Sequence, residues 1–351
     1  MRYKLFGNHT GLRVSEFVLG TANFGEAWGG HGANPDEARR IFDAYADAGG
    51  NFIDTANGYQ EGESEVLVGN LLTGRRDEFV LSTKFSVMTN SSSGILVTGN
   101  SRQAMVSSVE ASLKRLKTDR IDLYWAHVDD GFTPIEELMR GFDDLVRAGK
   151  ILYAGLSNFP AWRVARAATL AELRGTVPLA GIQIEHSLVQ RAPEQDLFPA
   201  SQALGLGLVA YSPLGGGVLT GKYRNTTGES RRDEAWGGAG FQPENSPQRT
   251  AIIDTLMTIA EEASVTPGEI AIAWVAAKGA LPIVGPRTLT QLNANLAAAA
   301  VTLSPEQMAR LNEVSTIARG YPHTVLDDPR IKDLVTAGNF DRIDAPSVPV
   351  A

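Results

Sequence analysis

Short apolar runs alternate with amphipathic segments along most of the chain. Eight of the runs are apolar at nearly every position rather than at alternate ones, which is typical of parallel strands buried on both faces. These runs are Phe17–Thr21, Asn51–Thr55, Phe79–Lys84, Ile121–His127, Ile151–Ser157, Ala180–Glu185, Leu206–Tyr211 and Leu281–Val284. Helical periodicity lies between them, so the pattern predicts about eight β-then-α units.

Several helices can be placed from local signals. Four segments combine a polar cap residue, a proline at the first helical position and a glutamate or glutamine at the third. The cap residues are Asn34, Thr133, Thr266 and Ser304. A helix is also expected over residues 101–116, because apolar residues there recur at spacings of three and four. Its buried stripe is predicted at Val106, Val109, Leu113 and Leu116.

The alternation favours one (β/α)₈ TIM-barrel domain over residues 1–351. An open doubly wound sheet is disfavoured, because the turn after the first strand, Leu19–Gly25, lacks the G-x-G-x-x-G spacing of such sheets. The stretch up to Val14 is expected to form an N-terminal hairpin, and Leu214–Gln248 a long loop after the seventh strand. Extra C-terminal helices are expected, with a tail from about residue 320 that is irregular.

Composition narrows the function classes. The net charge of −8 disfavours phosphate backbones and anionic membrane surfaces as partners, so neither nucleic acid nor membrane is predicted. The absence of cysteine excludes disulfides and thiolate nucleophiles, and the five histidines show no paired ligand spacing, so no metal site is predicted. With no apolar signal segment or spanning run, a cytoplasmic location is expected. The oligomeric state stays open.

Ionisable side chains follow three neighbouring strands where catalytic groups of barrels gather. The second strand ends at Asp54 with Tyr59 in the loop beyond it, the third ends at Lys84, and the fourth ends at His127. These residue types suit carbonyl reduction, in which an alkoxide formed by hydride transfer needs a proton. Tyr59 can donate it, Lys84 can lower the phenol pKa, Asp54 can keep Lys84 charged, and His127 can orient the carbonyl.

Other chemistries of these residues are weaker. A Schiff-base lyase would need Lys84 to be neutral, and the nearby Asp54 opposes this. Each residue also has an ordinary structural explanation, such as a cap, a packed ring or a snorkelling lysine. The joint placement at three adjacent strand ends favours a site.

The stretch from Asp54 to Tyr59 resembles the Asp-Thr-Ala-x-x-Tyr signature of the aldo-keto reductase superfamily. The likeness covers nearly the whole chain, and its further motifs are Ser82–Lys84, the strand ending at His127, Gly155–Asn158, Tyr211–Leu214 and Ile283–Arg287. The resemblance implies Tyr59 as acid/base, completed by Asp54, Lys84 and His127. The chain departs from the pattern at Gln60, where glycine is common, and around Asp129.

The resemblance also implies an extended nicotinamide cofactor, with NADPH favoured and NADH possible. The carboxamide would be held by Ser157, Asn158 and Gln183, and the ring stacked by Tyr211. The pyrophosphate region would be lined by Ser212, Pro213, Leu214, Gly217, Leu219 and Lys222, and Thr21 is assigned to the same cofactor. At the adenosine end, Gly285 precedes three residues expected on one helix face because of their spacing of four: Arg287, Gln291 and Asn295. The arginine fork suits a 2′-phosphate.

A small carbonyl compound is the expected partner, bound by loops after the strands. Pocket walls are predicted from Phe24, Trp28 and Phe85, and Trp236 and Phe241 of the long insertion are expected to close over the ligand. The identity of the carbonyl stays open. The alternative is a redox-sensing subunit that binds the cofactor, turns over slowly and acts through partners, as in family members that serve as channel β-subunits.

Overall fold

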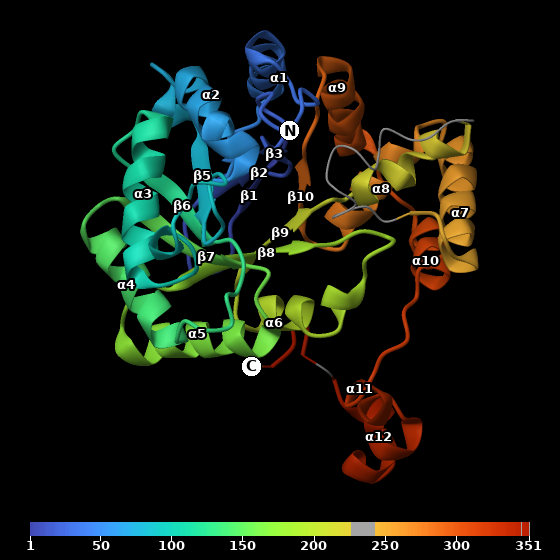
Figure 1. The fold of residues 1–351 in the computed structure, drawn as a ribbon. Helices are drawn as coiled ribbons and strands as arrows, with labels where there is room; N and C mark the ends of the chain where they lie inside the picture. Colours follow the sequence, from blue (N-terminus) through green and yellow to red (C-terminus); the bar gives the residue numbers. More distant parts are fainter. Residues whose placement is uncertain (226–242, 345, 351) are drawn as a thin grey trace.

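The structure is a computed structural model that describes the whole chain except residues 226–242, 345 and 351. Its centre is a closed barrel of eight parallel strands in the order β10-β3-β4-β5-β6-β7-β8-β9 (Figure 1). The strands are β3 Val18–Gly20, β4 Phe52–Asp54, β5 Val80–Phe85, β6 Ile121–Ala126, β7 Ile151–Ser157, β8 Leu179–Glu185, β9 Gly207–Tyr211 and β10 Leu281–Val284. The predicted (β/α)₈ fold is confirmed, and the eight expected strands differ from the observed ones only at their ends.

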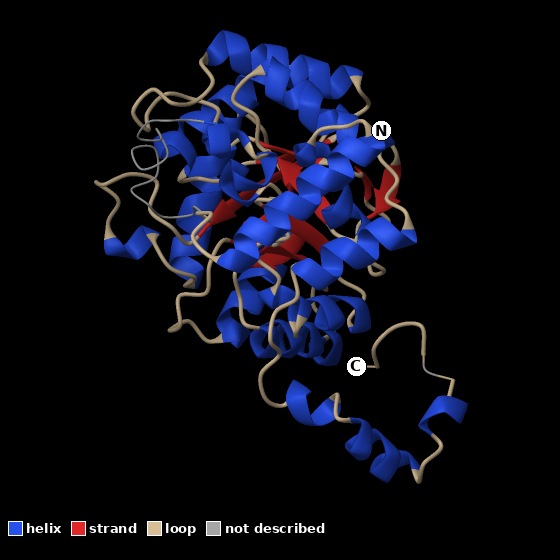
Figure 2. Cartoon of the chain, turned by 90° about the vertical axis from the view of Figure 1, so that its right-hand side faces the viewer, coloured by secondary structure: helices blue, strands red, loops and turns tan. Residues whose placement is uncertain are grey.

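Helices surround the barrel and connect successive strands (Figures 1 and 2). They are α1 Pro35–Asp47, α2 Glu63–Leu71, α3 Arg102–Leu116, α4 Ile135–Arg147, α5 Ala161–Arg174, α6 Leu197–Ala203, α7 Pro247–Ala263, α8 Pro267–Ala277, α9 Leu289–Ala297 and α10 Pro305–Val314. Short 3₁₀ segments are η1 Tyr59–Gly62, η2 Arg76–Glu78, η3 Ile95–Val97, η4 Ala192–Glu194, η5 Gly215–Thr220, η6 Lys222–Asn225, η7 Ala298–Ala300 and η8 Phe340–Arg342. Parallel strands joined in this way place all their carboxyl ends on one edge, called the carboxyl rim below.

Three of the four predicted helix caps are confirmed. Asn34, Thr266 and Ser304 each accept a hydrogen bond from the backbone N–H three residues later. Thr133 does not cap, and this prediction is wrong by one residue: Pro134 occupies the cap position and α4 begins at Ile135. The Thr133 hydroxyl donates to the Asp130 carboxylate of the preceding loop at 2.7 Å.

The buried stripe of α3 also differs from the prediction at one position. Val109, Leu113 and Leu116 are buried as expected, but Val106 is 41% exposed. Met105 takes its place, since Gly141 of α4 leaves room for the Met105 sulfur, which lies 2.8 Å from where a Cβ would stand. The spacing of three and four is compatible with either residue, and the neighbouring helix decides between them.

The predicted N-terminal hairpin is formed by β1 Tyr3–Leu5 and β2 Arg13–Ser15, which pair antiparallel. Phe6 follows β1 and is fully buried. Its ring meets Phe52 and Trp125 edge to face, with centroids 5.8 and 6.3 Å apart. Gly207 makes room for it, because a Cβ there would stand 2.6 Å from the ring. The hairpin therefore fixes the barrel end opposite the carboxyl rim.

The last part of the chain leaves the barrel. Beyond residue 320, where an irregular tail was predicted, it forms α11 His323–Leu326 and α12 Pro329–Thr336. Both lie apart from the barrel helices in the two views (Figures 1 and 2). In the described part of the chain, no helix combines the length and apolar character that a membrane span needs.

Phe6→Ala should lower the free energy of unfolding by about 3–5 kcal/mol, because it empties a fully buried aromatic site. Leu5→Ala is the matched control, since Leu5 is 64% exposed and its truncation should change stability by less than about 1 kcal/mol. Denaturant titration of both variants measures the difference. Equal losses would show that Phe6 does not hold this end of the barrel.

Candidate active site

Four ionisable residues meet at the carboxyl rim as predicted. Asp54 ends β4, Tyr59 begins η1 just beyond it, Lys84 lies near the end of β5, and His127 follows β6. The three strands are direct neighbours, because β4 pairs with β5 and β5 pairs with β6. The fold thus brings together residues that are up to 73 positions apart (127 − 54).

Lys84 is the centre of this group. Its fully buried ammonium donates to the Asp54 carboxylate, to the Thr55 carbonyl at 2.8 Å and to the Tyr59 hydroxyl at 3.0 Å. Burial lowers the pKa of the lysine, but the Asp54 carboxylate and, to a smaller extent, Tyr59 together outweigh burial and hold the pKa of Lys84 above its ordinary value. The side chain is therefore an ammonium at neutral pH and a poor nucleophile, which disfavours the Schiff-base alternative.

The Tyr59 phenol stays protonated near neutrality. Burial raises its pKa, the Lys84 charge opposes this, and the Asp54 charge adds to the rise. Lys84 thus acts in the predicted direction, but desolvation wins and the net pKa lies above the ordinary tyrosine value. The phenol is therefore the protonated species before reaction, and the Lys84 ammonium in contact with it offsets part of the cost of forming a buried phenolate.

His127 is a neutral imidazole at physiological pH. Burial, assisted by the charge of Lys84, lowers its pKa to about 3. Its ring stands edge-on to Tyr59, with centroids 5.9 Å apart and planes at 82°. A neutral imidazole carries one N–H that can donate to a carbonyl oxygen placed beside the phenol.

Asp54 is held by two further side chains. Its Oδ1 atom accepts from the Ser82 hydroxyl at 2.7 Å and from the Gln183 amide at 3.0 Å. The sequence analysis did not identify Ser82 as a site residue, although a signal for it exists. Ser82 lies two residues before Lys84 on β5, and alternate residues of a strand share a face. Gln183, predicted for the cofactor, also connects that region to the proton-donor group.

The residues predicted for the nicotinamide amide gather beside these four. Ser157 and Asn158 lie at the end of β7 and Tyr211 at the end of β9. The Tyr211 hydroxyl donates to Asn158 Oδ1 at 2.8 Å, and Asn158 Nδ2 donates to the His127 carbonyl at 2.9 Å. Asn158 adopts a left-handed backbone, φ 56°, that asparagine tolerates better than most residues.

Asp129, whose role the sequence left open, braces this corner. Its carboxylate accepts from Arg163 at 2.7 Å, and Arg163 also donates to the Thr133 carbonyl at 2.6 Å. The Asp129 backbone N–H donates to the Asn158 carbonyl at 3.4 Å. No sequence signal marked Arg163, because its partner follows a different strand, 34 residues earlier. The ion pair fixes the loop that carries His127 against the end of β7.

The loop after β9 forms a backbone cradle for an extended ligand. Ser212 is left-handed at φ 54°, and Gly215, Gly216 and Gly217 follow at φ 55°, 65° and 91°. Successive turns of this kind direct backbone N–H groups to one side. Pro213 and Leu219 are buried, Leu214 is half-buried and Lys222 is exposed, so mainly backbone and Lys222 remain for a pyrophosphate. The residues present fit the predicted cofactor segment.

The adenosine end differs in detail from the prediction. α9 begins at Leu289 with Thr288 as its cap, so Arg287 precedes the helix and does not share a face with Gln291 and Asn295. The Gln291 side chain instead turns back and accepts from the Arg287 backbone N–H at 2.8 Å. Gly285 is exposed nearby, and its carbonyl accepts from Asn23 at 2.8 Å.

Three predicted contacts are not brought to the site. Thr21 is fully buried, with its hydroxyl bonded to Ser64 at 2.9 Å, so it cannot reach a cofactor without repacking. Phe24 and Phe85 have no exposed surface and belong to the core outside the strands. Only Trp28 of the predicted pocket wall lies at the site, half-buried and edge-on to Tyr59 with ring centroids 6.3 Å apart. Trp236 and Phe241 lie outside the described residues.

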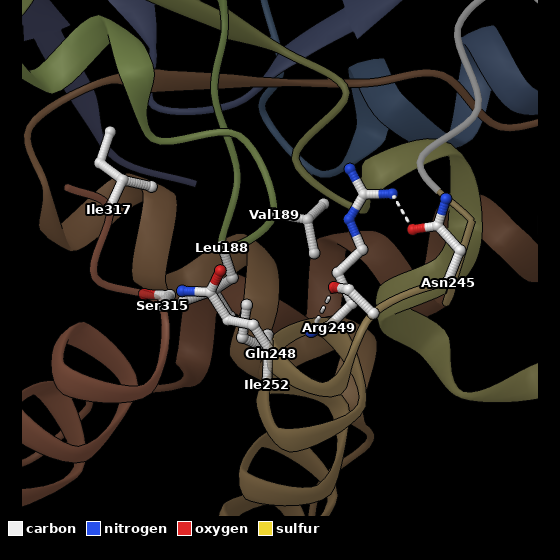
Figure 3. Close-up of a pocket in the computed structure, with 9 residues that line it drawn as sticks. Leu188, Val189, Asn245, Gln248, Arg249, Ile252, Ser315 and Ile317 are labelled. Carbon is white, nitrogen blue, oxygen red and sulfur yellow. Dashed lines mark hydrogen bonds between the residues drawn. The ribbon is translucent and has the colours of Figure 1, made fainter.

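A separate cavity of about 360 Å³ lies between the loop after β8, the start of α7 and the segment after α10 (Figure 3). Within it Arg249 donates to Asn245 at 3.0 Å, and Leu188 and Val189 are among the apolar residues that line it. None of the four ionisable residues lines it. The chemistry therefore belongs to the carboxyl rim. Among the described residues, no group of histidines and carboxylates could hold a metal ion.

Comparison with known proteins identifies related chains. The model of the Aldo/keto reductase family matches residues 16–316. Norsolorinic acid reductase B of Dothistroma septosporum is 36% identical, over 93% of this chain and 84% of the relative. Aryl-alcohol dehydrogenase [NADP(+)] of Phanerodontia chrysosporium is 32% identical, over 97% of this chain and 93% of the relative.

His127 should not titrate between pH 5 and pH 8, because its folded pKa is about 3. A depressed histidine pKa also means that the stability it contributes is present above the unfolded value of about 6.5 and is lost as the pH falls toward 3. Nitrogen-15 NMR of the imidazole, assigned with His127→Asn, measures both the pKa and the tautomer. A midpoint near pH 6.5 would show that the ring is not desolvated.

Proposed function

The chain belongs to the aldo/keto reductase family and is an NAD(P)H-dependent oxidoreductase, and we propose that it reduces aromatic aldehydes or ketones with Tyr59 as the proton donor. The observation that carries this proposal is the contact of Lys84 Nζ with the Tyr59 hydroxyl at 3.0 Å while the same atom donates to Asp54. When bound, the reduced nicotinamide supplies the hydride. The protein's own residues supply the proton and hold the carbonyl.

Proton donation by Tyr59 follows from its own pKa and from the charges of Lys84 and Asp54 beside it. The phenol is protonated before reaction because its pKa is raised. As hydride reaches the carbonyl carbon, negative charge grows on the oxygen, and a phenol beside that oxygen transfers its proton. The phenolate left behind faces the Lys84 ammonium, which is kept charged by Asp54 and needs no reorganisation to stabilise it.

His127 orients the carbonyl in this scheme. Its neutral imidazole lies edge-on to Tyr59, so an oxygen placed between the two rings can accept one bond from each. Because the ring does not gain a proton near neutrality, it cannot compete with Tyr59 as the acid. The two roles are therefore separated by their pKa values.

The residues proposed to hold the cofactor lie along the carboxyl rim. Ser157, Asn158 and Gln183 would hold the carboxamide, and Tyr211 would lie against the ring. The loop of Ser212–Lys222 would carry the pyrophosphate on backbone N–H groups. Arg287, next to the N-terminus of α9, suits a 2′-phosphate and supports a preference for NADPH. Leu289 N–H is already taken by Glu37 at 2.7 Å, so the guanidinium carries most of this preference.

An aromatic substrate is favoured by Trp28. Its half-buried indole is the aromatic group nearest to Tyr59 from the loop after β3, and rings prefer offset or edge-on contact with other rings. The name of the relative from Phanerodontia chrysosporium, an aryl-alcohol dehydrogenase that uses NADP(+), agrees with an aryl substrate and with this cofactor.

Tyr59→Phe should lower kcat for carbonyl reduction by about 10²- to 10⁴-fold, since it removes only the hydroxyl that donates the proton. Cofactor affinity should stay within about twofold, because the ring remains. Stopped-flow absorbance of the nicotinamide and fluorescence titration measure the two quantities. Tyr3→Phe on the exposed hairpin is the matched control and should leave kcat unchanged. Near-normal turnover of Tyr59→Phe would refute the acid assignment.

Arg287→Ala should weaken NADPH binding by about 10- to 100-fold and NADH binding by less than about threefold, because only NADPH carries the 2′-phosphate. Titration calorimetry with each cofactor measures both affinities. Arg13→Ala, on the hairpin at the opposite end of the barrel, is the control and should change neither. Equal losses for the two cofactors would remove Arg287 from the phosphate site.

A further inference from the structure

The residue after Tyr59 occupies backbone that side chains disfavour. Gln60 has φ 48° and ψ 43°, and Glu61 repeats this left-handed geometry at φ 53° and ψ 31°. Glycine adopts such a conformation without cost, whereas a Cβ crowds the following carbonyl. Strain of this kind persists only where surrounding contacts outweigh it, and of these two residues only Gln60 has a buried side chain that could supply such contacts.

The Gln60 side chain is nearly fully buried and makes two directed bonds. Its Oε1 atom accepts from the Trp28 backbone N–H at 2.8 Å, and its Nε2 atom donates to the Ala22 carbonyl at 3.1 Å. Both partners belong to the loop between β3 and α1. One amide thus ties the two ends of the Ala22–Trp28 segment to the turn that carries Tyr59.

Glu63, the first residue of α2, adds a second attachment. Its Oε2 atom accepts from the backbone N–H groups of Glu26 at 2.8 Å and Ala27 at 3.2 Å. The loop packs directly on this pair, since a Cβ at Gly25 would lie 2.6 Å from the same oxygen and 3.0 Å from Gln60 Cβ. Together Gln60 and Glu63 form a clamp, the Gln60–Glu63 clamp, on the loop that carries Trp28.

The clamp sets where the indole stands. Trp28, Tyr59 and His127 form a row of three rings, with centroid separations of 6.3 and 5.9 Å and near-perpendicular planes. A carbonyl bound beside the Tyr59 hydroxyl would lie next to the rings that contact Tyr59, and Trp28 is one of them. The hydrogen bond from the Trp28 backbone N–H to Gln60 Oε1 has the most direct effect on the indole position, because it fixes the backbone of Trp28 itself.

We infer that Gln60 is a specificity-determining positioning residue: through the Gln60–Glu63 clamp it holds Trp28 as an aromatic wall that selects aryl carbonyls. The inference rests on the proposed carbonyl reduction and adds the residue that sets the substrate class. Gln60 does not touch the reacting atoms. Its effect should therefore appear in substrate discrimination and not in the chemical step.

Gln60→Gly separates this role from a merely structural one. The substitution removes the clamp amide, which lowers stability, and relieves the left-handed strain, which raises it, so the two effects on the unfolding temperature oppose each other. Glu61→Gly is the matched control, because it relieves the same strain at an exposed side chain outside the clamp. Any loss confined to Gln60→Gly then reports the side chain.

The kinetic test compares benzaldehyde with butanal, whose short chain makes little contact with an aromatic wall. For Gln60→Gly, the ratio of kcat/KM for benzaldehyde to that for butanal should fall by about tenfold, mainly through KM, with kcat within about twofold. Trp28→Ala should show the same fall, and adding Gln60→Gly to it should cause no further loss. An unchanged ratio, or an equal fall in Glu61→Gly, would overturn the inference.

A measurement without cofactor or substrate separates this inference from the proposed function. Hydrogen exchange of the peptide covering residues 22–28 should become faster in Gln60→Gly and stay unchanged in Glu61→Gly. If the wild-type protein reduced neither aldehyde, the proposed function would fail. Unchanged hydrogen exchange in Gln60→Gly would overturn the clamp, whether or not the protein reduces these aldehydes. Fast exchange together with a lower benzaldehyde preference supports both.

Discussion

The buried ammonium of Lys84 is the constraint on which the site depends. A charge with no exposed surface is costly unless it is paired and hydrogen-bonded, and here Asp54, the Thr55 carbonyl and the Tyr59 hydroxyl supply those partners. Removing one partner would leave the other charge buried and alone. The group is therefore held as a unit, and the proton donor is in place before any ligand arrives.

Barrel closure is what makes this unit possible. Asp54 and Lys84 lie on paired strands, and Gln183 reaches Asp54 from β8 on the other side of the barrel, 129 residues later in the chain. Only a sheet closed on itself directs side chains from non-adjacent strands toward one axis. Phe6 packs against Phe52 and Trp125 and fills the opposite end, while the four ionisable residues lie at the carboxyl rim.

The sequence could predict the barrel and the four ionisable residues because both depend on order along the chain. Strand ends follow from apolar runs, and the carboxyl ends of neighbouring parallel strands meet by geometry. The direction in which a side chain points was harder to predict. Phe24 and Phe85 lie close to site residues in the sequence, but both belong to the core between the strands and the helices. Arg287 was placed on a helix because a spacing of four does not show where the helix begins. At Gln60 the sequence showed only that glutamine stands where the family signature often has glycine. Its hydrogen-bond partners could not be predicted, because they lie in the loop between β3 and α1.

Backbone strain shows where the fold has been shaped for the site. Apart from helix ends, all described non-glycine residues with positive φ follow barrel strands at the carboxyl rim: Gln60, Glu61, Ser86, Asn158 and Ser212. Several of these side chains hold neighbours of the reacting groups. Ser86 accepts from the His127 N–H at 3.1 Å, Asn158 donates to the His127 carbonyl, and Gln60 binds the Trp28 N–H. Strain at such positions persists only where the surrounding contacts outweigh it. The left-handed turns therefore place polar side chains where a regular strand end could not, and the rim owes its precise layout to them.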